Sequence, residues 1–313
     1  MRVFVTGASG WIGSALVPEL LAVGHDVLGL ARSDRAAHTV AGLGADVHRG
    51  SLEDIGSLRS GAEQAEGIVH LGYHHDFSQM LEAAQIDRRA IETFGEVLAG
   101  TDAPLVVAAG VLGLGGGRVA TERDRPDAAL HPRVATGDVV LSLAERGVRT
   151  AVVRFAPTVH GPGDQGFIAT LVELARRTGV AGYVEDGSNR WPAVHRLDAA
   201  QLVRLAVESA PAGSVLHAVD EPGLPTRDIA EAIGRSIGVP AQSIPAARAA
   251  EHFGWIGGFF GMDSAASNTL TRELFGWTPT HPGLLADLDA GRYIESSPHS
   301  TAGPSVADQD RTR

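Results

Sequence analysis

The sequence contains no cysteine and no lysine. The absence of cysteine excludes disulfide bonds, thiolate catalysis and metal sites held by cysteine. The absence of lysine makes all 26 basic residues arginine and removes a common catalytic amine. Tyrosine occurs only at Tyr73, Tyr183 and Tyr293, so a catalytic phenol has few candidates.

Long hydrophobic runs and an excess of positive charge are also absent. No run reaches the roughly 18 apolar residues of a membrane span, and no signal-peptide pattern follows Met1. The net charge of −11 argues against nucleic acid or an anionic membrane as the main partner. We therefore expect a cytoplasmic protein that acts on a small molecule; the oligomeric state stays open.

The first thirteen residues, MRVFVTGASGWIG, place a glycine-rich turn between an apolar strand and an apolar helix. Glycines at this spacing let the turn close, let backbone N–H groups approach a pyrophosphate, and let the helix pack on the strand. The helix N-terminus adds partial positive charge. The pattern predicts a dinucleotide site formed by Gly7, Ser9, Gly10, Trp11, Ile12 and Gly13.

The residues after the second predicted strand, 25–30, indicate which dinucleotide binds. An acidic residue here would bind the 2′-hydroxyl of NAD, whereas an arginine accommodates the 2′-phosphate of NADP. Arg32 with Ser33 favours NADPH, while Asp34 keeps NADH open as the alternative. Arg35 is either a second phosphate contact or the start of a helix.

A polar tetrad, Tyr73-His74-His75-Asp76, follows the fourth predicted strand, 67–72. Ligands of such sheets bind beyond the carboxyl ends of the strands, so the tetrad is expected near the cofactor. It either contacts the substrate or nicotinamide, or forms a plain polar loop. We predict no metal site, because adjacent side chains diverge and do not make a fixed ligand set.

Strand and helix patterns alternate along the whole chain. Apolar runs at 104–110 and 149–155 predict further buried strands, helical patterns occupy 167–178 and 226–237, and a helix beginning near 199 is expected to be capped by Asp198. Such alternation predicts an α/β fold, a Rossmann-type doubly wound parallel sheet with a smaller C-terminal substrate-binding region. The expected parts are an NADP-binding domain at 1–160 with elements returning later, a substrate-binding region at 161–295 and a disordered tail at 296–313.

Four segments in matching order resemble the extended short-chain dehydrogenase/reductase family over residues 1–293. They are TGASGWIG at 6–13, VVRFAPTVHGPG at 152–163, RWPAVHRLDAA at 190–200 and FGWTP at 275–279. The resemblance implies that Arg32 and Ser33 contact the 2′-phosphate, and that Ser51 and Leu52 contact the adenine. It also implies that Leu71 and Gly72 contact the ribose, and that Ala108, Phe155 and Thr158 lie at the nicotinamide end. Ser51 replaces the family's Asp and is equally consistent with a helix N-cap.

The family's catalytic residues do not carry over. Its mechanism uses a Tyr and a Lys four residues apart on a helix, with a Ser or Thr after the fifth strand. Counting back from Arg154 puts the Lys position near Arg133 and the Tyr position near Ala129 or Leu130. The Ser position falls in 108–110, where no hydroxyl occurs. All three positions are empty.

The empty positions lead to one favoured function and two alternatives. The chain is similar to the angucyclinone polyketide ketoreductases of the simocyclinone type, atypical members in which a phenol beside the ketone could supply the missing polarisation. This similarity predicts NADPH-dependent reduction of an aromatic polycyclic polyketide in antibiotic biosynthesis. A cofactor-retaining isomerase or epimerase and a non-enzymatic NADP-binding sensor stay open.

Several residues are candidates for contact with the substrate. Tyr73, His75 or His160 could act as the acid, although His160 also fits a structural turn. Arg190, Trp191 and Tyr73 are predicted substrate contacts, and the aromatic stretch 252–260 either lines a pocket for a flat ligand or fills the core.

Overall fold

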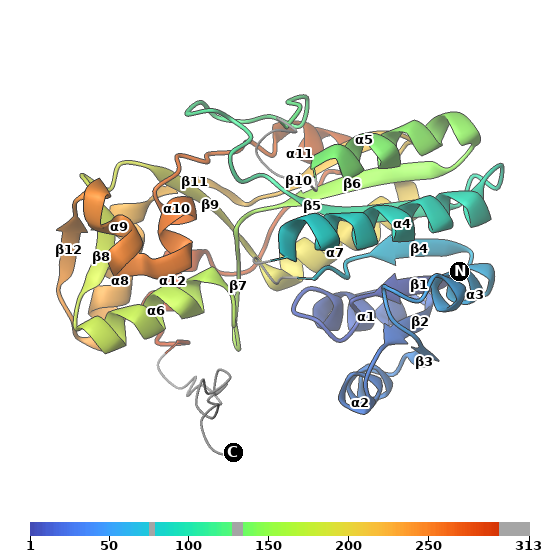
Figure 1. The fold of residues 1–313 in the computed structure, drawn as a ribbon, viewed down its shortest axis with the longest axis horizontal. Helices are drawn as coiled ribbons and strands as arrows, with labels where there is room; N and C mark the ends of the chain where they lie inside the picture. Colours follow the sequence, from blue (N-terminus) through green and yellow to red (C-terminus); the bar gives the residue numbers. More distant parts are fainter. Residues whose placement is uncertain (75–78, 127–133, 294–313) are drawn as a thin grey trace, which may run out of the picture.

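A computed structural model describes residues 1–74, 79–126 and 134–293 (Figure 1). Its central sheet has seven strands in the order β10-β6-β5-β4-β1-β2-β3, and every neighbouring pair is parallel. The strands are β1 (Arg2–Thr6), β2 (Asp26–Ala31), β3 (Asp46–Arg49), β4 (Gly67–His70), β5 (Pro104–Gly110), β6 (Arg149–Phe155) and β10 (Ser214–Ala218). The predicted doubly wound parallel sheet is confirmed.

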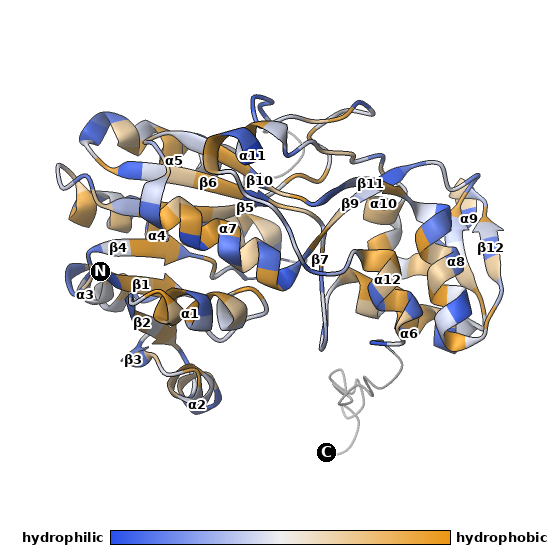
Figure 2. Ribbon diagram, turned by 180° about the vertical axis from the view of Figure 1, so that it is seen from behind, coloured by the Kyte–Doolittle hydropathy of each residue, from blue (hydrophilic) through white to orange (hydrophobic). Residues whose placement is uncertain are grey.

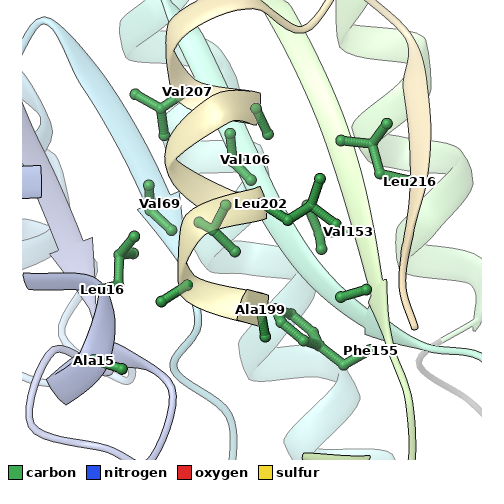
Figure 3. Packing of buried hydrophobic residues seen from close by; sticks show 14 of the residues in the cluster. Ala15, Leu16, Val69, Val106, Val153, Phe155, Ala199, Leu202, Val207 and Leu216 are labelled. Atoms are coloured by element: carbon green, nitrogen blue, oxygen red, sulfur yellow. The ribbon is translucent and has the colours of Figure 1, made fainter. Parts of the chain in front are cut away.

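Helices cover both faces of this sheet. One face carries α1 (Gly13–Ala22) and α7 (Arg196–Ser209), and α2 (Asp34–Gly42) connects β2 to β3. Figure 3 shows Leu16 of α1 and Leu202 of α7 packed with Val69, Val106 and Val153 of the strands. The other face carries α3 (Ile55–Glu63), α4 (Met80–Leu98), α5 (Val134–Ser142) and the short helix η2 (Leu143–Arg146).

The burial of both faces explains why the strands are continuous apolar runs rather than alternating ones. In β1, Val3 and Val5 belong to the cluster under α1 and α7, whereas Phe4 belongs to the cluster under α3, α4 and α5. All three side chains are fully buried. The order of the sheet reverses between β1 and β4, so the carboxyl ends of these strands flank the position where such folds bind ligands.

The second region has its own small sheets and its own core. A three-stranded sheet has the order β11-β9-β7 and a two-stranded sheet pairs β12 with β8. The hydropathy colouring in Figure 2 shows apolar residues on its helices as well as on the central strands. Its elements are β7 (Thr158–His160), α6 (Phe167–Thr178), β8 (Ala181–Val184), β9 (Arg190–His195), β11 (Glu221–Pro225), α8 (Thr226–Ile237), β12 (Ala241–Ile244), α9 (Ala246–Phe253), η3 (Gly254–Ile256), α10 (Gly257–Phe260) and α12 (Leu284–Asp289); α11 (Thr269–Phe275) packs beside β10.

Two predicted helix caps are wrong. Helix α3 begins after Asp54, whose carboxylate accepts a hydrogen bond from Ser57 N at 3.1 Å, so Ser51 is not its cap. Helix α7 begins after His195, whose Nδ1 accepts from Leu197 N, and not at Asp198. The Asp198 carboxylate instead accepts from the backbone N–H groups of Thr280 and His281.

Among the described residues, no helix is both long and apolar enough to cross a membrane. The predicted tail at 296–313 and the candidate acid His75 lie outside the described residues.

Candidate functional site

A cavity of about 2140 Å³ runs along the carboxyl ends of the central strands and into the second region. Its walls include the glycine turn after β1, the residues after β2 and β4, the ends of β5 and β6, and the start of α6. A cavity of this size exceeds the roughly 300–1,000 Å³ typical of a single small-molecule pocket, so it has room for two ligands side by side.

The glycine turn at one end has no room for larger side chains. Gly7 has φ +71°, and a Cβ there would lie 2.8 Å from Gly72 N. A Cβ on Gly13 would overlap the Gly7 carbonyl oxygen. The first turn of α1 has no acidic residue and no side-chain cap, so no side chain of this helix competes with an anion for its N-terminus. All six predicted residues of this turn line the cavity: Gly7, Ser9, Gly10, Trp11, Ile12 and Gly13.

A buried polar chain holds the turn against β4. Thr6 Oγ1 lies 2.7 Å from His70 Nδ1 and accepts from Gly72 N at 3.1 Å. His70 Nε2 lies 3.2 Å from Asp87 Oδ1 on α4. These bonds fix the backbone of Leu71 and Gly72, both in the cavity wall. Sequence reasoning missed this chain, although the His of the Val-His-Leu strand was a visible signal.

Two arginines line the cavity beside β2, and Arg32 lies within electrostatic reach of Glu53, whose pKa it helps to lower. Arg32, Ser33 and Arg35 line this part of the cavity, and neither arginine forms an ion pair with a described residue. Ser33 also caps α2, since its Oγ accepts from Ala36 N at 3.2 Å. Asp34 does not line the cavity and pairs with Arg49 at 2.7 Å. The acid that could read a ribose hydroxyl therefore points elsewhere.

Ser51 and Leu52, the residues expected at the adenine end, also line the cavity. The neighbouring Glu53 pairs with His74 at 2.7 Å. A hydrogen bond from the Ser51 side chain, opposed by partial burial, lowers the pKa of Glu53 from its ordinary value. This carboxylate is therefore ionised at neutral pH and is held by His74.

Among the described residues, the cavity wall formed by the end of β5 and by α5 carries no hydroxyl or amine side chain. Ala108, Ala109 and Gly110 at the end of β5 line the cavity and carry no hydroxyl. Helix α5 presents Gly137, Asp138 and Leu141, with neither a phenol nor an amine. The positions that the sequence assigned to the Tyr and Lys, Ala129, Leu130 and Arg133, lie outside the described residues.

Arg154 of β6 is the buried cation nearest this wall. It lines the cavity, and its Nη1 donates to the Asp124 carbonyl oxygen at 2.9 Å. Burial lowers its pKa, while the charges of Asp124, Glu122 and Asp138 oppose that shift. Phe155 and Thr158, predicted at the nicotinamide end, follow it in the cavity wall.

The candidate acids are placed differently from one another. Tyr73 lines the cavity. His160 is fully buried, lies outside the wall, and has its Nδ1 2.8 Å from Asp287 Oδ2. The assignment of His160 as a possible acid is therefore wrong: it is a structural residue, packed edge-on against His195 at 5.4 Å.

Two predicted substrate contacts lie behind the cavity wall. The Arg190 side chain donates two hydrogen bonds to Asp263, at 2.9 and 2.6 Å, and its backbone N donates a third at 2.8 Å. Asp263, and not Arg190, lines the cavity. Trp191 is fully buried, with its ring centroid 5.1 Å from Phe260 and 5.5 Å from Phe167. Both support the wall from behind, so the prediction of direct contact fails for them.

The aromatic stretch at 252–260 is divided between the core and the cavity. Phe253 and Phe260 are buried in the core, whereas Trp255 and Phe259 line the cavity. Their centroids lie 5.6 and 6.3 Å from that of Phe167, and Trp255 is 51% exposed. The three rings form an apolar wall that faces the ligand space.

Asp164 and Arg196 also line the cavity, and sequence reasoning missed both. Asp164 is 4% exposed and accepts hydrogen bonds from Gly166 N and the Tyr293 hydroxyl. Burial raises the pKa of Asp164 despite these bonds. The signal for Arg196 was its position, directly after the carboxyl end of a strand.

Three described residues, His195, Asp198 and His281, bring possible metal-ligand atoms within 4.8 Å of one another. The two imidazole rings are stacked at 4.7 Å with only 8° between their planes. Because ring nitrogens bind a metal within the ring plane, parallel stacked rings do not converge on one ion. The geometry is that of a packed histidine pair.

The model of the NAD dependent epimerase/dehydratase family matches residues 3–109. Uncharacterized protein C2A9.02 of Schizosaccharomyces pombe is 42% identical over 295 residues, 94% of this chain and 100% of that protein. The 4-hydroxy-2-methyl-3-oxo-4-farnesyl-3,4-dihydroquinoline-1-oxide ketoreductase of Stigmatella aurantiaca is 30% identical, covering 81% of this chain and 80% of that protein.

Among solved structures, the UDP-glucose 4-epimerase of Thermus thermophilus in complex with NAD superposes with a TM-score of 0.71. It is 19% identical and covers 95% of this chain and 100% of the epimerase chain, so the likeness extends to the fold of both regions. The sequence similarities, the glycine turn and the seven-stranded parallel sheet agree. The chain belongs to the NAD dependent epimerase/dehydratase family, the extended short-chain dehydrogenases/reductases.

Proposed function

We propose that this protein is an NADPH-dependent ketoreductase that works without the family's Tyr acid. The observation that carries the proposal is the contrast within one cavity. The cavity wall contains every residue of the predicted glycine turn, together with Arg32 and Arg35. Among the described residues, Ala108–Gly110 and the cavity face of α5 offer no catalytic hydroxyl or amine. Three relatives at 27–30% identity carry reductase names, which supports reduction over epimerisation.

The residues at the β2 end favour NADPH over NADH. Arg32 and Arg35 line the wall without ion-pair partners among the described residues, and Ser33 keeps a hydroxyl hydrogen to donate. Arginine suits the planar, multidentate recognition of phosphate. Asp34, which would favour NADH, is paired with Arg49. We place the 2′-phosphate at Arg32 and the nicotinamide toward Phe155 and Thr158. The cofactor contacts proposed from the sequence all line the cavity: Gly7, Ser9, Gly10, Trp11, Ile12, Gly13, Arg32, Ser33, Ser51, Leu52, Leu71, Gly72, Ala108, Phe155 and Thr158.

The wall of Phe167, Trp255 and Phe259 supports a flat, apolar substrate. Aromatic side chains favour offset or edge contacts with other rings, and Trp255 leaves half of its surface available. This agrees with an aromatic polycyclic ketone of the polyketide type. Tyr73, which also lines the cavity, is a further proposed substrate contact.

Bound NADPH would supply a hydride to the carbonyl carbon of such a ketone. The carbonyl oxygen then needs a hydrogen-bond donor, and Ala108, Ala109 and Gly110 provide no side-chain donor. A phenolic hydroxyl on the substrate, bonded to the ketone oxygen, would stabilise the alkoxide in place of a tyrosine and pass its proton to it. The resulting phenolate would regain a proton from solvent. The chain's own contribution is to hold the two reactants in register and exclude water.

The division of labour follows the two regions. Residues 1–160, with α7 and β10 returning to the central sheet, would hold the cofactor, and residues 161–295 would supply the substrate wall. This assignment accounts for a cavity shared by both regions.

The test is NADPH oxidation, beside NADH, with matched polycyclic ketones that carry or lack a hydroxyl next to the carbonyl, and with simple ketones. The proposal expects turnover with NADPH only for hydroxyl-flanked ketones. Equal turnover of the ketones that lack the hydroxyl would show that the protein supplies the acid. Tight NADPH binding without turnover of any ketone would favour the sensor or isomerase instead.

A further inference from the structure

Arg196, the first residue of α7, brings a cation from the second half of the chain onto the glycine turn. Its guanidinium carbon lies 4.1 Å from the ring centroid of Trp11, inside the turn. Its Nη2 also lies 3.3 Å from Ser14 Oγ, in the first turn of α1. Arg196, Trp11 and Ser14 all line the cavity, so the cation stands over the N-terminus of α1 on the ligand side.

The position of this cation is fixed before any ligand binds. Trp11 Nε1 donates to the Val159 carbonyl oxygen at 2.7 Å, which holds the indole between the two regions. An indole face attracts an arginine guanidinium electrostatically, and the attraction is stronger when water is excluded. A pre-positioned side chain loses less conformational entropy on binding than a free one.

No carboxylate among the described residues neutralises this charge at ion-pair distance. Arg196 Nε is buried without a hydrogen-bond partner among those residues. The nearest acid that acts on it, Asp164, is occupied by Gly166 N and the Tyr293 hydroxyl. A buried N–H donor without an acceptor destabilises the folded protein, and a ligand that supplies the acceptor removes this penalty.

We propose that Arg196 binds the pyrophosphate of the dinucleotide, adding a side-chain cation to the backbone cradle of Gly7 to Gly13. The inference rests on the proposed dinucleotide binding and adds a residue to it. Arg196 would act on the part that NADPH and NADH share, whereas Arg32 would act on the 2′-phosphate alone. The second half of the chain would thereby contribute to cofactor affinity as well as to the substrate wall.

The experiment compares Arg196→Gln, Arg196→Lys and the control Arg204→Gln by calorimetric titration with NADP⁺ and NAD⁺. Arg204 lies on the same helix outside the cavity and is paired with Glu19 and Glu208. Arg196→Gln should raise the Kd of both dinucleotides by the same factor, about tenfold or more, because a charge-assisted phosphate contact is lost. Arg196→Lys should recover part of this loss, and Arg204→Gln should leave both Kd values unchanged.

Salt separates a charge effect from damage to the fold. In about 1 M salt the ratio of the Kd of Arg196→Gln to the Kd of the wild type should decrease, because screening weakens the contact between Arg196 and the pyrophosphate in the wild type. An unchanged Kd in Arg196→Gln, or a difference that salt does not narrow, would overturn the role of Arg196. If the wild-type protein bound neither dinucleotide, the proposed function itself would fail, which is a distinct result.

Discussion

Small residues line the cavity both at the glycine turn and at the end of β5, but they have opposite consequences at the two places. At the glycine turn, Gly7 and Gly13 bring the backbone close enough for its N–H groups to meet a ligand. At the end of β5, Ala108–Gly110 face the same space and present no reactive group. Small size would serve binding at the glycine turn, whereas at the end of β5 it leaves no side-chain hydroxyl or amine. Under the proposed function, the family's cofactor-binding residues are retained while catalysis depends on the substrate.

The largest loss of dinucleotide affinity is expected for Gly7→Ala in the glycine turn. The new Cβ would lie 2.8 Å from Gly72 N, at a residue with φ +71°. Strain of this kind costs about 1–3 kcal/mol, and the shifted backbone would spoil the phosphate contacts. We expect dinucleotide affinity to fall by about two orders of magnitude in a calorimetric titration.

The matched control for this change is Gly24→Ala. Gly24 also has a positive φ, +87°, but a Cβ there meets no atom within 4 Å. It should lower the free energy of unfolding by about 1 kcal/mol through backbone strain and leave affinity unchanged. Equal loss of affinity in both variants would contradict the role assigned to the turn.

Arg32→Gln should sharpen the distinction between the two cofactors. Removing the cation beside the predicted 2′-phosphate should weaken NADPH binding about tenfold, whereas NADH binding should change by no more than about twofold. Competition between the two dinucleotides, followed at equilibrium, measures both effects at once. A parallel loss for NADH would place Arg32 at a part of the cofactor common to both.

Trp255→Ala tests the aromatic wall at the substrate end. Loss of a ring that packs at a tilt against Phe167 should raise the KM for a polycyclic ketone about tenfold and leave kcat near its wild-type value. Simple ketones should be unaffected. Leu274→Ala, an exposed apolar residue outside the cavity, is the control. A fall in kcat with unchanged KM would instead connect Trp255 to the chemical step.

The smallest expected effect concerns pH and His195. Burial, with the neighbouring imidazoles of His160 and His281, lowers the pKa of His195 to about 4 from 6.5, against the pull of Asp287 and Asp198. The unfolded chain therefore binds a proton that the folded imidazole does not. The free energy of unfolding should fall as the pH drops from 6.5 toward 4, with no contribution from this group above that window.

His195→Asn keeps an acceptor for the start of α7 without the titration. Urea unfolding at several pH values should show a shallower acid dependence in this variant than in the wild type. Identical slopes would mean that other groups account for the acid sensitivity.

Much of the fold could be predicted because its signals are local. Strands β5 and β6 and helices α6 and α8 begin and end as expected, since apolar runs and turn residues mark them directly. The glycine turn was equally readable, because its glycines are needed within one short segment. These features depend on neighbours along the chain.

The residues that were misassigned or missed depend on distant contacts. Asp198 has the composition of a cap, but it binds backbone groups at Thr280 and His281. Trp191 looked like a substrate contact, but the strand direction sends it into the core of the second region. Arg196 acquires its role only when α7 packs beside α1. The spacing of residues along the sequence does not reveal such contacts between distant segments.

The four tryptophans provide an intrinsic fluorescence signal for ligand binding in this cavity. Trp191 and Trp277 are buried and should give a constant background of fluorescence, whereas Trp11 in the glycine turn and Trp255 in the aromatic wall both line the ligand space. Reduced nicotinamide absorbs where tryptophan emits, so NADPH should quench emission by energy transfer. In a Trp255→Phe protein the ligand-dependent signal would come from Trp11. The placement of these indoles lets the arrival of each reactant be timed separately, without a label.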